Sequence, residues 1–94
     1  MTTSWQTEKP TSIRQVELRD GADFGLAISE IRHARGWTQE EMARKLGIGL
    51  TRSYLAALES GRTTRAMEHY FHILRRCGAT VIVNFDPTDR GDDG

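Results

Sequence analysis

Residues 37–61 read WTQEEMARKLGIGLTRSYLAALESG, and this stretch decides the fold. Thr38 and Glu41 have the spacing of a capping box, in which each side chain accepts a hydrogen bond from the backbone N–H of the other residue. Trp37 lies just outside this box and Met42 just inside it, which is the spacing of a hydrophobic staple. We therefore predict that a helix begins at Thr38.

A second helix follows after a turn that contains two glycines. Thr51 can cap this helix, and Leu55 and Leu58 form its narrow apolar side. The opposite side is small and polar, and consists of Arg52, Ser53, Ala56, Ala57 and Ser60. Such a face fits the major groove of B-DNA, because small side chains allow a close approach and arginine can donate to guanine. An ordinary solvent-exposed face would have the same composition.

Two further helices flank this pair. The first can be capped by Asp20 or Asp23, and the last by Thr63 or Thr64. Each of them ends at a glycine. The apolar stripe of the last helix consists of Met67, Tyr70, Phe71, Leu74 and Cys77.

The segment after the last helix, ATVIVNF, predicts a β-strand that needs a partner. Within the chain, a weak strand pattern at residues 16–18 is available for pairing. Pairing with the same strand of a second copy would satisfy the backbone by symmetry, and this is the arrangement that we favour. Both pairings could coexist in one larger sheet. The predicted dimer interface consists of Val81, Ile82, Val83 and Phe85.

The charge of the chain is zero overall but unevenly distributed. Residues 28–77 contain nine Lys/Arg and five Asp/Glu, whereas the last nine residues contain four Asp and one Arg. A basic centre is compatible with phosphate binding. The chain has no apolar run of the roughly 18 residues that a membrane span needs, and it lacks the apolar core of a signal peptide. With Cys77 as its only cysteine, we expect a cytoplasmic protein.

Residues 26–77 resemble the helix-turn-helix domain of the Xre/Cro repressor family. The matching runs are IR (31–32), GWTQEEMA (36–43), TRSYL (51–55) and LESG (58–61). The resemblance implies a mainly α, four- to five-helix lambda-repressor-like domain. The run YFHIL (70–74), followed by a β-branched strand, is similar to the end of HipB-like antitoxins, in which the final strands of two subunits pair.

The resemblance assigns a role to individual residues. Gln39 would contact phosphate, residues 51–53 would meet the bases, and Arg62 would reach the DNA backbone. Arg32 and Glu59 match the positions of a structural salt bridge between the first and third helices. The predicted DNA-binding residues are Thr38, Gln39, Gly49, Thr51, Arg52, Ser53, Tyr54, Ala57 and Arg62.

The turn between the paired helices departs from the family pattern. Ile48, Gly49 and Leu50 make this connection about two residues longer than is usual in the family. A longer turn could change how the recognition helix enters the groove. Gly49 could itself approach a phosphate, because it has no side chain.

The resemblance implies a homodimeric repressor that binds a palindromic double-stranded DNA operator and acts as the antitoxin of a toxin, such as a HipA-like kinase. The alternatives are a stand-alone phage-type repressor, a protein adaptor without DNA binding and, least favoured, an RNA-binding protein. His69 and His72 lack the further ligands of a metal site, so we expect no catalytic residues, metal or cofactor.

The chain is expected to divide into four parts, and none of them is expected to contact a membrane. The four parts are a disordered arm (1–12), the DNA-binding domain (13–78), the dimerisation strand (79–86) and a disordered acidic tail (87–94). Trp5 in the arm and the acidic tail are candidate toxin contacts.

Overall fold

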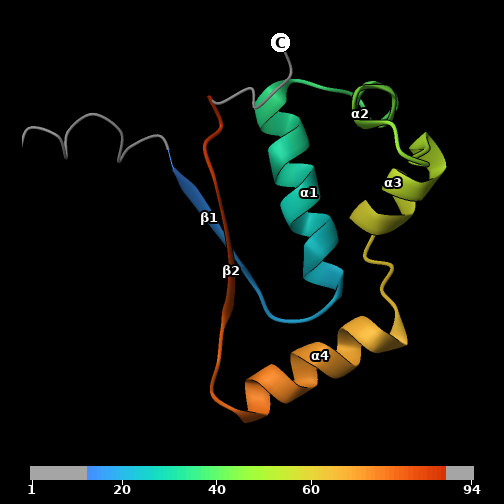
Figure 1. Cartoon of the computed structure of the whole chain (residues 1–94). Helices are drawn as coiled ribbons and strands as arrows, with labels where there is room; N and C mark the ends of the chain where they lie inside the picture. Colours follow the sequence, from blue (N-terminus) through green and yellow to red (C-terminus); the bar gives the residue numbers. More distant parts are fainter. Residues whose placement is uncertain (1–12, 89–94) are drawn as a thin grey trace, which may run out of the picture.

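The computed structural model describes residues 13–88. The predicted arm with Trp5, and residues 89–94 of the predicted tail, lie outside the described residues. The elements are β1 (Arg14–Leu18), α1 (Ala22–Arg35), α2 (Gln39–Leu46), α3 (Arg52–Glu59), α4 (Arg65–Arg76) and β2 (Val81–Phe85). Helix α1 lies between the β-strands on one side and α2 and α3 on the other (Figure 1). The described part of the chain is therefore mainly helical, as the sequence predicts.

The two strands pair with each other inside one chain. They form an antiparallel sheet whose register runs from Arg14 opposite Phe85 to Leu18 opposite Val81. Of the pairings that the sequence leaves open, this is the intrachain one, and the pairing across a dimer that we favoured stays a prediction. Burial favours the intrachain pairing, because β1 brings Leu18, which is 2% exposed, into the core beneath this sheet.

The helices begin at the residues that their capping chemistry selects. Thr51 accepts a hydrogen bond from the N–H of Tyr54, and Thr64, rather than Thr63, accepts one from that of Met67. Helix α1 differs in part from expectation, because its N-cap residue is Gly21, which has no side-chain cap; the Asp20 carboxylate nevertheless accepts from the N–H of Ala22 at 3.1 Å.

Two small cores lie on either side of α1. The first contains the buried residues Leu18, Ala27 and Phe71, and Phe24 meets Phe71 edge to face with the ring centroids 5.5 Å apart. The second contains the buried residues Met42, Ala43 and Leu55, with partly buried Ile28, Trp37, Leu50 and Leu58 packed against them. Helix α1 thus joins the sheet to the α2–α3 pair.

Helix α4 buries less of its apolar stripe than its sequence pattern suggests. Phe71 is 4% exposed, but Tyr70 is 63% and Leu74 is 37% exposed. Only one side of α4 meets the first core, so the flank that includes Tyr70, Ile73 and Leu74 remains on the surface. Among the described residues, no helix combines the length and apolar character needed to cross a bilayer.

Candidate nucleic-acid interface

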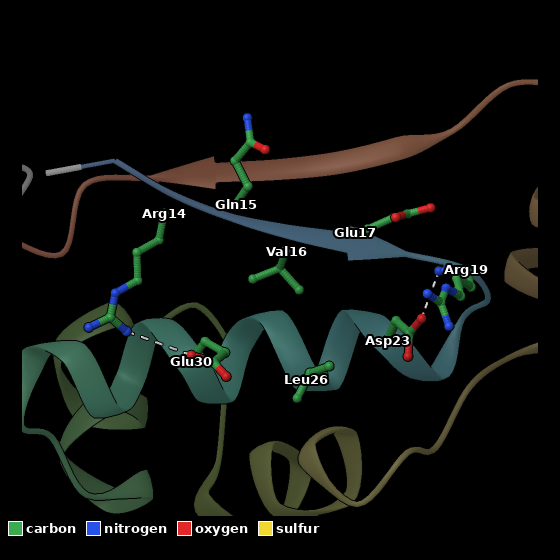
Figure 2. Close-up of a pocket in the computed structure, with 8 residues that line it drawn as sticks. All are labelled: Arg14, Gln15, Val16, Glu17, Arg19, Asp23, Leu26 and Glu30. Atoms are coloured by element: carbon green, nitrogen blue, oxygen red, sulfur yellow. Dashed lines mark hydrogen bonds and ion pairs between the residues drawn. The ribbon is translucent and has the colours of Figure 1, made fainter. Parts of the chain in front are cut away.

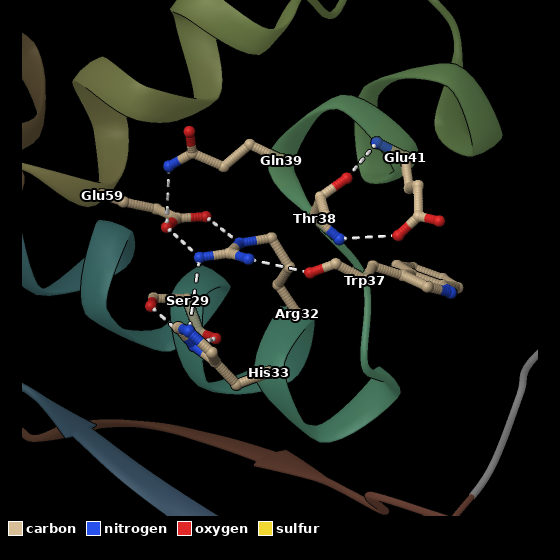
Figure 3. Close-up of polar contacts among 8 residues, drawn as sticks. All are labelled: Ser29, Arg32, His33, Trp37, Thr38, Gln39, Glu41 and Glu59. Atoms are coloured by element: carbon tan, nitrogen blue, oxygen red, sulfur yellow. Dashed lines mark hydrogen bonds and ion pairs between the residues drawn. The ribbon is translucent and has the colours of Figure 1, made fainter.

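An ion pair holds α3 against α1. The Nε of Arg32 donates to one carboxylate oxygen of Glu59 at 2.8 Å, and its Nη2 donates to the other at 2.9 Å. The Nη1 of Arg32 donates to the carbonyl oxygen of Trp37 at 2.8 Å, so the same guanidinium also ties down the segment that enters α2 (Figure 3). The structure thus brings together the two residues for which the sequence predicts a structural salt bridge.

The pair is nearly buried and mutually stabilised. The side chains of Arg32 and Glu59 are 12% and 9% exposed. The hydrogen bonds from Arg32 lower the pKa of Glu59 below its usual range, with a further lowering from the Gln39 amide, and the bonds to Glu59 raise the pKa of Arg32. Both groups therefore stay charged at neutral pH, as a bidentate arginine–carboxylate pair requires.

Two residues that the sequence predicts to contact DNA, Thr38 and Gln39, lie at the start of α2. The hydroxyl of Thr38 accepts from the N–H of Glu41 at 3.0 Å, and the Glu41 carboxylate accepts from the N–H of Thr38 at 2.8 Å. The bond from the Thr38 backbone lowers the pKa of Glu41. Gln39 donates one amide hydrogen to Glu59 at 3.1 Å. The Thr38 hydroxyl proton and the second amide hydrogen of Gln39 can each still donate to a phosphate.

The α2–α3 turn has an unusual backbone. Gly47, Ile48 and Gly49 all have positive φ, at 61°, 54° and 74°. The N–H of Leu50 donates to the carbonyl of Gly47 at 3.2 Å, which closes the turn. The side chain of Leu50 packs against the second core, whereas that of Ile48 is 94% exposed. The predicted contact Gly49 is exposed beside it.

The face of α3 that the sequence assigns to DNA is open to solvent at its first turn. Arg52, Ser53 and Tyr54 are exposed, while Leu55 is 2% exposed and anchors the helix in the second core. Ala57 is partly buried farther along the helix. Arg62 is exposed after the end of α3, where its N–H donates to the carbonyl of Ala57 at 3.0 Å.

Residues 28–69 match the family model described as helix-turn-helix. Residues 28–69 are a helix-turn-helix domain. The match begins within α1, includes α2 and α3, and ends in the first turns of α4. None of the curated proteins or solved structures compared with the chain matches it.

Several arginines of this helix-turn-helix domain are at least partly exposed. Arg52 and Arg62 form no ion pair with another residue in the range 13–88. Arg44 near the end of α2 is exposed, and Arg35 lies over the Trp37 ring at 5.8 Å from its centroid. Glu59 is paired with Arg32, whereas Glu40 at the start of α2 is exposed. The exposed guanidinium groups of Arg52 and Arg62 can attract phosphate.

The domain also has features that the sequence pattern did not reveal. Gln39, which is predicted to contact phosphate, donates to Glu59, and the Trp37 carbonyl accepts a further hydrogen bond from Arg32. Ile48 was not among the predicted site residues. The signal that could have pointed to it was the length of the α2–α3 turn, which is about two residues longer than the family pattern.

A separate pocket of about 460 Å³ lies between β1 and α1, away from α3. Val16 and Leu26 line it, and Arg14 and Glu30 approach within 3.7 Å of each other at one end (Figure 2). Its charged groups are of both signs. Within residues 13–88 there is no group of three or more His, Cys, Asp or Glu side chains that could hold a metal ion.

Proposed function

We propose that this protein is a sequence-specific, DNA-binding transcriptional regulator that inserts α3 into the major groove. The observation that carries the proposal is the arginine-bearing and solvent-exposed first turn of α3 in a helix-turn-helix domain. The Arg32–Glu59 pair supports it, because it holds the orientation of α3 relative to α1. A helix that reads bases needs such a rigid support.

The proposed contacts follow from the chemistry of each side chain. Arg52 donates to guanine O6 and N7, and Ser53 bonds a base or a phosphate. Thr38 and Gln39 donate to one phosphate group, which their positions at the start of α2 support. The remaining proposed contacts are Gly49, Thr51, Tyr54, Ala57 and Arg62.

We further propose that the protein acts as a homodimer. Strand β2 is bonded to β1 along one edge and has no partner among residues 13–88 along the other. Joining the free edges of two copies would build a four-stranded sheet, with Ile82, which is 47% exposed, next to the junction. The contribution of Val81, Val83 and Phe85 to this dimer interface would be smaller than expected, because their own chain already partly buries them. Two α3 helices could then read half-sites about one DNA turn apart.

An antitoxin role is the finer form of the proposal. It rests on the similarity of residues 70–85 to the end of HipB-like antitoxins, and it implies a toxin partner in the cytoplasm, such as a HipA-like kinase. The exposed flank of α4 with Tyr70, Ile73 and Leu74 supports a protein partner of some kind. A stand-alone repressor would bind the operator equally well, so co-purification from the native operon distinguishes the two.

The test begins with selection of bound sequences from a random DNA library by the full chain. Fluorescence anisotropy with the selected site then compares wild type with Arg52→Ala, for which we expect a loss of about 5- to 150-fold, or ~1–3 kcal/mol. Arg14→Ala is the matched control, because Arg14 is an exposed arginine on β1. Binding should weaken steeply as salt increases. A wild-type protein that selects no sequence and binds no DNA at low salt would refute the proposal.

The homodimer is tested separately by sedimentation of the free protein and of its DNA complex. Ile82→Lys, which places a charge beside the proposed junction, should shift the free protein toward monomer. A wild type that stays monomeric both free and on the operator would contradict the dimer but not DNA binding.

A further inference from the structure

Ile48 combines two features that folding alone does not favour. It is the one non-glycine residue with positive φ among residues 13–88, and a β-branched side chain is rarely found in that conformation. Its side chain is also 94% exposed, the highest value among the exposed large hydrophobic residues of the described chain. A glycine or asparagine would suit this backbone better and would expose less apolar surface.

The lengthened turn produces this exposure. Leu50 packs with Leu58 against the buried residues of the second core, so the apolar position of the turn is already filled. The hydrogen bond from the Leu50 N–H to the Gly47 carbonyl then closes a tight turn with Ile48 and Gly49 at its tip. The extra residues thus direct an isoleucine outward.

The tip lies close to the start of the recognition helix. Thr51, the N-cap of α3, is three positions after Ile48, so their Cα atoms are at most about 11 Å apart. The exposed Arg52 and Ser53 follow directly. When the first turn of α3 enters a major groove, a tip within this distance can reach the same groove, which is about 12 Å wide.

We propose that Ile48 is a specificity-determining residue that contacts the C5-methyl group of a thymine beside the bases read by Arg52. This inference rests on the proposed function. An aliphatic side chain has no hydrogen-bonding group, and the thymine methyl is the apolar feature that a base edge presents in the major groove. The contact also accounts for an exposed isoleucine where the backbone favours glycine.

The test pairs a protein change with the removal of a single DNA methyl group. Deoxyuridine replaces each thymine of the selected operator in turn, which deletes the methyl and leaves the base pairing unchanged. At one position next to the Arg52-dependent bases, this change should weaken wild-type binding by about 5- to 30-fold, within the usual effect of one altered base pair. Ile48→Gly should weaken binding to the unmodified operator by a similar factor and be insensitive to that deoxyuridine.

Unfolding measurements separate this effect from loss of structure. Ile48→Gly should retain or raise the melting temperature, because glycine relieves the strained φ. Leu26→Ala is the matched control, since Leu26 is also an exposed aliphatic residue, at 49%, but lies on α1, and it should leave operator affinity unchanged.

Three results would overturn the inference. The first is that Ile48→Gly binds the operator as tightly as wild type does. The second is that Ile48→Gly loses the same factor of affinity for the operator and for random DNA. The third is that Ile48→Gly weakens operator binding, but no single deoxyuridine weakens wild type more than it weakens the variant. The last two would indicate a contact with the sugar–phosphate backbone. Wild-type and Arg52→Ala results decide the proposed function independently, because neither involves Ile48.

Discussion

Replacing Glu59 with glutamine removes one charge and leaves the shape of the side chain almost unchanged. In the native protein the Glu59 carboxylate accepts from two nitrogens of Arg32 and from the amide of Gln39. A glutamine in the same place presents an NH₂ group on one side, and because Arg32 donates to both carboxylate oxygens, this group faces the guanidinium in either orientation. At least one donor then points at another donor, and Arg32 loses its counter-ion.

The size of the effect follows from the geometry and the burial. A hydrogen bond to a charged group contributes ~1.5–3 kcal/mol, and breaking one side of a fully buried ion pair costs ~3–5 kcal/mol. Because the two side chains remain 12% and 9% exposed, water compensates part of this loss. We expect Glu59→Gln to lower the free energy of unfolding by about 2–4 kcal/mol. That is a large fraction of the ~5–15 kcal/mol typical of a folded domain.

Urea unfolding followed by far-ultraviolet circular dichroism measures this free energy, and the slope of the transition checks that unfolding stays two-state. The matched control is Glu17→Gln on β1, where an exposed carboxylate is removed and a change within about 0.5 kcal/mol is expected. A loss below about 1 kcal/mol for Glu59→Gln would refute the reasoning that this ion pair holds α3 in place.

Two further predictions concern acid stability and the contact between α1 and α3. Arg32 lowers the pKa of Glu59 in the folded state, so this stabilisation is complete above the ordinary glutamate value of 4.5 and is lost as pH falls through the lower folded pKa. Urea titrations from pH 7 to 3 should therefore show a steeper loss for wild type than for Glu59→Gln, and parallel curves would contradict the assignment. Gly25→Ala places a methyl group against the backbone carbonyl of Leu58, so we expect a destabilisation of at least ~2 kcal/mol. Helix propensity alone would instead stabilise the alanine variant by about 1 kcal/mol, so the sign of the change in urea decides between the two effects.

The local elements and their chemistry could be predicted from the sequence. The capping box at Thr38 and Glu41 and the cap at Thr51 are formed by residues three apart, so neighbouring residues specify them without help from the rest of the fold. The ion pair of Arg32 and Glu59 spans 27 residues, and it was predictable because the motif runs around it resemble a known family.

Tertiary packing decided the features that depend on residues distant in the chain. Strand β2 could pair with β1 or with another copy, and burial of Leu18 against Ala27 and Phe71 selects β1 within one chain. The apolar pattern of α4 specifies an amphipathic helix. How much of its apolar stripe is buried depends on how α4 packs against the first core.

The α2–α3 turn shows the same division within four residues. The sequence by itself determined that GIGL interrupts the two helices, because glycine and the cap at Thr51 are local signals. Ile48 and Leu50 have similar hydrophobicity, so their order in the chain does not say which one is buried. The closed turn brings Leu50 to the second core and leaves Ile48 facing solvent.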